Sequence, residues 1–261
     1  MKHLLSALLI TLPIYLLAQY SEQIHTERPL MTGNPFTVGK SVLQVEGGYT
    51  FGYSPVGARI NTHTLELLLR YGLTERLELY AGLDQNWWSF EQVRIGAPDR
   101  ALYNLGGLTN VGFKLNLFTD LGLISNLSIQ SEVRMPSVKY NNLVDSRYHS
   151  VSMLKGDIPI GKRWDIRMSA GLGFFFHEES FGRETVQYYA IATTFDVGSH
   201  WTTWLELNLS DYAAQTTGLR GGAIYRVRDN LQFDLSLGYV SDWLSNLYTG
   251  SVGAAYRLNW R

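Results

Sequence analysis

Apolar and polar residues alternate along most of the chain with a period of two. From Leu43 to Phe51, the odd positions are apolar or Gly and the even positions are mostly polar. The runs from Trp164 to Phe174 and from Leu231 to Tyr239 repeat this pattern, and helical spacing fits none of them. Because successive side chains of a β-strand point to opposite faces, each run predicts a strand with one apolar face and one polar face.

Twelve segments of this kind follow one another. They cover residues 40–53, 61–71, 76–88, 105–118, 125–136, 149–160, 164–177, 185–197, 201–212, 218–227, 231–240 and 247–260. Short connections alternate with longer ones, such as residues 89–104 and 137–148. An even number of strands, with short turns at one end and longer loops at the other, is typical of an outer-membrane barrel. The pattern therefore predicts an all-β fold, an antiparallel up-and-down transmembrane β-barrel of about 12 strands spanning residues 39–261.

A secreted, soluble β-sandwich would alternate in the same way and is the main alternative. A sandwich of this length would normally split into two domains, but the sequence has no Pro/Ser-rich or charged linker. Many of the predicted strands are also longer than the usual 5–6 residues and match the roughly 9–11 tilted residues that cross a bilayer. The barrel is therefore the favoured fold.

The first residues have the composition of an export signal. Lys2 and His3 precede an apolar run from Leu4 to Leu17, and the small residue Ala18 follows. This order predicts a signal peptide over residues 1–18, which would send the protein to the bacterial outer membrane. The alternative is a membrane anchor, but an apolar run interrupted by Pro13 is short for one.

Residues 19–38 do not alternate, and they contain Pro29 and Pro35. They are expected either to remain a loose periplasmic segment or to fold into the lumen as a plug. The plug hypothesis depends on the closeness of residues 26–29 to the first predicted strand.

Composition excludes several classes of function. Charged residues make up 17% of the chain, against roughly 25% in ordinary soluble domains. The 22 Lys and Arg nearly balance the 23 Asp and Glu, so the chain lacks the basic surface of a nucleic-acid-binding protein. The absence of Cys excludes thiolate metal sites and a cysteine nucleophile.

Charged residues on the polar faces of the predicted strands should line the lumen. The acidic ones are Glu46, Glu66, Glu78, Asp84, Glu132, Asp165, Glu206 and Asp234, and the basic ones are Arg70, Lys114, Arg134, Arg167, Arg220, Arg226 and Arg257. A pore selective for ions of one sign should have a ring of that sign, and this near balance lacks one. Two interpretations stay open: the residues pair across strands and hold the lumen together, or they line a path for solute.

Two polar clusters are candidates for a catalytic or metal site. His177, Glu178 and Glu179 form one cluster, and His149 and Ser150 form the other. Neither has a flanking catalytic signature, and adjacent strand residues point to opposite faces, which disfavours a shared metal ion. The sequence therefore predicts no enzyme, no cofactor and no metal site.

The last predicted strand resembles the insertion signal of outer-membrane proteins. The residues that carry this resemblance are Gly253, Tyr256, Leu258 and Trp260. Such chains usually end in Phe, whereas this sequence ends in Trp260 and Arg261.

Four segments also resemble a known family. They are Ile24–Pro29, Asn34–Lys40, Leu43–Tyr49 and Leu69–Leu79, and together they resemble the outer-membrane family named for a meta-pathway of phenol degradation. The matching motif in the first segment consists of Thr26, Glu27, Arg28 and Pro29, with Glu27 where the family usually has Asp. The resemblance implies a barrel that passes small hydrophobic or aromatic compounds.

The sequence thus predicts a monomeric barrel in contact with outer-membrane lipid. Its expected function is the passive passage of a small-molecule solute through a polar lumen. A structural barrel, or a component of envelope assembly that conducts nothing, is the alternative, and a barrel enzyme is less favoured.

Overall fold

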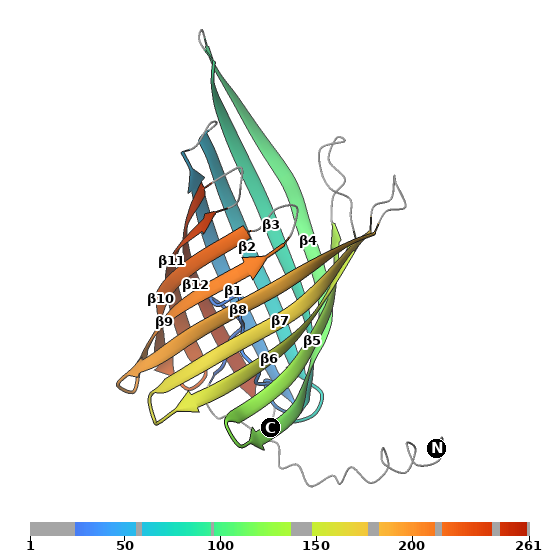
Figure 1. Cartoon of the computed structure of the whole chain (residues 1–261), viewed down its shortest axis with the longest axis vertical. Helices are drawn as coiled ribbons and strands as arrows, with labels where there is room; N and C mark the ends of the chain where they lie inside the picture. The colour runs from blue at the N-terminus through green and yellow to red at the C-terminus, as the bar shows by residue number, and fades with distance from the viewer. Residues whose placement is uncertain are drawn as a thin grey trace.

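Twelve antiparallel strands form a closed barrel, in which each strand pairs with its neighbours in sequence and β1 pairs with β12 (Figure 1). The computed structural model describes residues 24–55, 59–94, 97–136, 148–176, 183–211, 216–241 and 246–259. The strands are β1 Val42–Ser54, β2 Arg59–Gly72, β3 Leu77–Arg94, β4 Ala97–Leu121, β5 Ile124–Pro136, β6 Tyr148–Ile160, β7 Trp164–Phe176, β8 Arg183–Val197, β9 Trp201–Ser210, β10 Thr216–Arg228, β11 Leu231–Ser241 and β12 Asn246–Asn259. The prediction of an all-β, up-and-down barrel of 12 strands is confirmed.

One predicted loop is wrong. Residues 89–104 were expected to connect two strands, but β3 continues to Arg94 and β4 already begins at Ala97, opposite it. The resulting hairpin extends well beyond the neighbouring strands (Figure 1). Apolar and polar residues alternate only where the two faces of a strand meet different surroundings. Strand pairing that continues beyond that part of the barrel therefore produces no alternation in the sequence.

Short turns lie at one end of the barrel, which we call the turn end; the opposite end is the loop end. Gly122, Gly161 and Gly198 occupy these turns with φ of 69°, 72° and 85°, where glycine has no steric cost. Val42 pairs with Asn259 at the same end. The described wall therefore begins and ends at the turn end.

The two faces of the wall have opposite character. Leucines in the middle of strands face outward and are about half exposed, such as Leu67 (45%) and Leu235 (54%). The residues buried inside are mostly polar or charged. Aromatic pairs lie toward both ends, with Trp164 and Phe195 4.6 Å apart at the turn end. An apolar band between aromatic ends is typical of a transmembrane barrel.

In the part of the chain that the structure describes, no helix is long and apolar enough to cross a membrane.

A charge on the apolar band should destabilise the barrel according to its depth. Leu235 lies near the middle of β11, and Leu231 lies on the same face at the turn end. We expect Leu235→Arg to cost about 2–4 kcal/mol and Leu231→Arg about 0–1 kcal/mol, since the cost of a lipid-facing charge falls toward the interfaces. Urea unfolding in lipid vesicles measures both values. Equal losses would contradict the assignment of the apolar band to the hydrocarbon layer.

Candidate functional site: a chain segment inside the barrel

Residues 24–41, which we call the inner segment, run inside the barrel before β1 begins (Figure 1). Most of these residues are buried, although they form no regular secondary structure. Their partners on the wall lie in the turn-end halves of strands on several sides of the lumen, including β1, β3, β4, β6 and β9. The inner segment therefore crosses the lumen near the turn end.

Three buried carboxylates of the wall accept hydrogen bonds from backbone amides of the inner segment. Glu46 accepts from the amides of Glu27 (3.0 Å) and Arg28 (3.3 Å), Glu206 from those of Met31 (3.0 Å) and Thr32 (2.7 Å), and Glu78 from that of Val38 (2.9 Å). An irregular segment cannot satisfy its own amides, and buried amides without a partner are costly. Charged acceptors make these hydrogen bonds strong. The wall thus supplies the hydrogen bonds that secondary structure would otherwise provide.

The carboxylate of Glu27 lies among three cations. It forms an ion pair with Lys114, and it lies 2.6 Å from the Nζ of Lys155 and 3.6 Å from Nη2 of Arg70. Burial alone would raise the pKa of Glu27, but the positive charges of Lys114, Lys155 and Arg70 lower the pKa well below its usual range. Glu27 therefore stays ionised and links β2, β4 and β6 through one side chain.

Arg28 makes the corresponding contacts on the opposite side of the segment. Its guanidinium forms an ion pair with Glu66 and lies 3.6 Å from Asp234. It also donates a hydrogen bond to the hydroxyl of Ser251 at 3.0 Å. These residues join β2, β11 and β12 to the inner segment.

Two glycines create the space that the Arg28 guanidinium occupies. Gly48 of β1 and Gly253 of β12 are cross-strand partners on the inner face. A Cβ atom at Gly48 would overlap the guanidinium, and one at Gly253 would press on its Nε and on the carboxylate of Asp234. The wall therefore has a niche shaped for this side chain.

One apolar contact accompanies these polar ones. Leu30 of the inner segment packs in a buried cluster with Ala192 of β8 and Trp204 of β9, and Ile224 of β10 lies against it. These inward-facing apolar residues interrupt an otherwise polar lining. The contact fixes the middle of the segment against the wall.

The other residues of the sequence motif are also buried. Thr26 donates from its hydroxyl to the carbonyl of Arg28 at 2.6 Å, and its hydroxyl accepts from Gln232 at 2.8 Å. Its carbonyl accepts a hydrogen bond from Asn34, and Pro29 is buried. All four motif residues thus lie within the lumen.

The structure brings about half of the predicted lumen residues into contact with the inner segment. Those with a hydrogen bond or ion pair to it are Glu46, Glu66, Arg70, Glu78, Lys114, Glu206 and Asp234. The remaining eight lie elsewhere on the wall, and three of them, Asp165, Arg167 and Arg226, border a cavity beside residues 24–28. Also among the eight are the pair Glu132 and Arg134, 2.5 Å apart, and Arg257, which donates to Gln44 at 3.1 Å.

The other five of these wall residues fall into two groups. Asp165, Arg167 and Arg226 lie on β7 and β10 near the turn end. Asp84 and Arg220 lie farther along β3 and β10 and are half-buried. The predicted set thus does not form one continuous ring.

Three charged residues of the lumen were missed in the sequence. Lys155 and Asp157 of β6 are buried, and Asp196 lies on the inner face of β8. The inner face of β6 also contains the apolar residues Val151 and Met153, so its pattern does not identify the polar side. The alternate spacing of Lys155 and Asp157 was the only local signal.

Some predicted features fall outside the described residues. They are the signal peptide (residues 1–18), Trp260 of the insertion signal, and the cluster at residues 177–179. Tyr256 and Leu258 lie on the outer face of β12, and Gly253 lies on its inner face. His149 and Ser150 are consecutive on β6 and so point to opposite faces.

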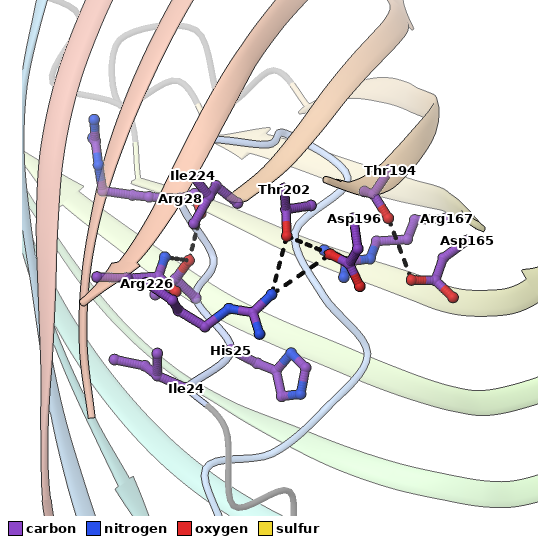
Figure 2. Close-up of a pocket in the computed structure, with 12 residues that line it drawn as sticks. Ile24, His25, Arg28, Asp165, Arg167, Thr194, Asp196, Thr202, Ile224 and Arg226 are labelled. Atoms are coloured by element: carbon purple, nitrogen blue, oxygen red, sulfur yellow. Dashed lines mark hydrogen bonds and ion pairs between the residues drawn. The ribbon is translucent and has the colours of Figure 1, made fainter. Parts of the chain in front are cut away.

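A cavity of about 200 Å³ separates the inner segment from the wall near the turn end (Figure 2). It lies between residues 24–28 and strands β7 to β11. Only Ile24 and Ile224 of its lining residues are aliphatic; the others are polar or charged. Within the described residues, no group of three His, Cys, Asp or Glu side chains could hold a metal ion.

The imidazole of His25 faces this cavity. Burial, together with the positive charges of Arg167, Arg257, Arg226 and Arg70, lowers the pKa of His25 well below its usual value. The ring is therefore neutral at pH 7.

No family model and no curated protein matches this chain. Solved structures do. The COG4313 outer membrane channel from Pseudomonas putida F1 has a TM-score of 0.68 at 14% identity, covering 87% of this chain and 98% of that one. The KdgM porin in complex with disordered oligogalacturonate has a TM-score of 0.57 at 10% identity, covering 82% and 98%. The NanC porin has a TM-score of 0.54 at 12% identity, covering 83% and 100%. At these identities the likeness shows a shared barrel fold.

The glycine niche gives a test of how the inner segment is held. We expect Gly48→Ala to displace the Arg28 guanidinium and to speed hydrogen exchange of the amides of residues 27–32. Gly47→Ala is the matched control, because a Cβ there would lie 3.8 Å from its nearest neighbour, an ordinary contact. Mass spectrometry of the protein after hydrogen exchange in detergent measures the exchange rate in each variant. Equal protection in the two variants would show that the niche does not hold the segment.

Proposed function

We propose that the protein is an outer-membrane channel in which the inner segment narrows the lumen and small solutes pass beside it. The observation that carries this proposal is the polar cavity between the inner segment and the wall. Eight-stranded barrels are filled by their own side chains, and barrels of sixteen to eighteen strands leave an aqueous channel. Here twelve strands enclose a lumen that a separate chain segment occupies in part.

Three further observations support the location and the class of function. The apolar outer band with aromatic ends suits a bilayer. Residues 1–18 have the composition of a signal peptide. The chain is similar in fold to solved proteins described as an outer membrane channel and as porins. We propose that the protein acts as a monomer.

The resemblance to the phenol meta-pathway family suggests hydrophobic or aromatic solutes. The cavity lining favours small polar ones, because an apolar solute would displace water from charged groups and offer no hydrogen bonds in return. Passive diffusion through the remaining space is the mechanism that this geometry supports.

A structural barrel that conducts nothing is the second candidate. The dense contacts of Glu27 and Arg28 with the wall favour it, because they could hold the lumen permanently closed. Conductance distinguishes the two functions.

Removing the inner segment should widen the channel. We expect the wild-type protein to show a small single-channel conductance in planar bilayers, and deletion of residues 20–34 to raise it several-fold. Deletion of residues 20–23 is the control, since it leaves the contacts of Glu27 and Arg28 in place. If both deletion variants had the same conductance, the inner segment would not be the part of the protein that narrows the lumen. No conductance from any correctly folded variant would favour the structural barrel.

Glu27→Gln should loosen the inner segment without removing it. The change leaves Arg70, Lys114 and Lys155 facing one another without their shared carboxylate. Breaking a buried ion pair in this way costs about 3–5 kcal/mol, so we expect frequent transitions to a larger conductance. Glu75→Gln is the control, because the Glu75 carboxylate accepts a hydrogen bond from the Lys40 amide at the edge of the segment, and the substitution leaves the backbone carbonyl that accepts from Thr37 in place. An unchanged current trace for Glu27→Gln would show that the cation cluster does not hold the segment closed.

A further inference from the structure

The contacts of the inner segment differ between the two sides of the lumen. On the side of β1 and β2 the segment lies directly against the backbone. A Cβ at Gly72 would overlap the carbonyl of Gly39, as one at Gly48 would overlap the Arg28 guanidinium. On the side of β7 to β10 the middle of the segment contacts the wall through Leu30 and Thr32, but the cavity of about 200 Å³ separates residues 24–28 from it. This cavity is a space in which a solute could pass residues 24–28 of the segment.

Charged and hydroxyl side chains line the wall of this cavity and interact with one another (Figure 2). Arg226 donates to the hydroxyl of Thr202 at 3.0 Å and lies 3.6 Å from the carboxylate of Asp196. Thr194 donates to the carboxylate of Asp165 at 3.3 Å. These contacts hold the side chains along the wall rather than across the cavity.

Arg167 of the cavity lining also pairs with Asp157 of β6. The Nε of Arg167 lies 3.5 Å from Oδ1 of Asp157. Both atoms are buried, and neither forms a hydrogen bond within the described residues. Arg167 therefore has an acidic neighbour on β6 in addition to its place in the cavity lining.

We infer that small solutes pass the inner segment through this cavity, and that zwitterions pass it more readily than ions of either sign. The inference rests on the proposed channel function and names its route and its solute class. The carboxylates of Asp165 and Asp196 and the guanidiniums of Arg167 and Arg226 face one space. A cation is attracted by the two carboxylates and repelled by the two guanidiniums, and an anion the reverse. A zwitterion can place its ammonium near a carboxylate and its own carboxylate near a guanidinium.

The size of the cavity limits the solute. At about 30 Å³ per water molecule, about 200 Å³ holds roughly six waters. A small amino acid therefore fits with part of its hydration shell. Larger solutes would require the inner segment to move.

Three probes of nearly equal size test the solute class with the full-length protein in liposomes. They are alanine (zwitterion), lactate (anion) and alaninamide (cation). We expect wild-type protein to pass alanine fastest. The double variant Asp165→Asn with Asp196→Asn should raise the rate of lactate relative to alaninamide by about threefold or more, as removal of nearby negative charge predicts. The double variant Arg167→Gln with Arg226→Gln should change the ratio in the opposite direction.

Two control variants test whether the solute route runs through the cavity. Glu132→Gln neutralises a lumen carboxylate on β5, away from the cavity, and Lys162→Gln removes an exposed charge at the turn end. Neither should change the ratio. A shift with Glu132→Gln and none with the cavity variants would place the route elsewhere and overturn the inference. No flux of any probe through folded wild-type protein would instead overturn the proposed channel function.

A second experiment tests the route with single, conservative substitutions, in case the double variants do not fold. The chain has no Cys, so a single introduced thiol is the only target for methanethiosulfonate ethylammonium. Thr202→Cys places the thiol on the cavity wall, and Thr203→Cys places it on the outer face. We expect modification to lower the conductance of Thr202→Cys by about half, since the added group fills much of the passage, and to leave Thr203→Cys unchanged. Equal responses would contradict the route.

Discussion

The structure depends on polar contacts between the barrel wall and the inner segment, in which buried amides and charges of the segment meet hydrogen-bond acceptors or opposite charges on the wall. A closed sheet satisfies its own backbone, but an irregular segment inside it cannot. The wall carboxylates of Glu46, Glu78 and Glu206 meet this need by accepting hydrogen bonds from the segment's amides. Glu27 and Arg28 then place charges of both signs against wall residues of opposite charge. The lumen is held together by polar contacts rather than by an apolar core.

These contacts also explain where space remains. Strong attachment to β1 and β2 draws the segment against one side of the lumen, where Gly48, Gly72 and Gly253 allow close approach. On the opposite side, Leu30 still contacts β8 and β9, but beside residues 24–28 the side chains of β7 to β10 bind one another and leave the cavity open. The position of a passage thus follows from the position of the attachments.

The balance of charge has a similar consequence. Acidic and basic residues in the lumen are nearly equal in number, and many form close pairs. No ring of one sign is present among the described residues, so the lumen does not act as a simple filter for one kind of ion. Local arrangement, rather than net charge, then decides which solutes find partners. This is why the cavity lining, more than the overall composition, informs the proposed function.

The sequence by itself determined the barrel, the number of strands and the face to which most side chains point, because a lipid-facing and a water-facing side impose a period of two. It did not show that β3 and β4 continue into residues 89–104, because there the two faces of a strand no longer meet lipid on one side and water on the other. It also did not show the partners of Arg28, since Glu66 and Asp234 lie far from it in the chain and adjoin it only when the sheet closes. Alternation is a local property of a strand, whereas pairing across a lumen depends on strand order, register and closure. Only the tertiary structure decides those.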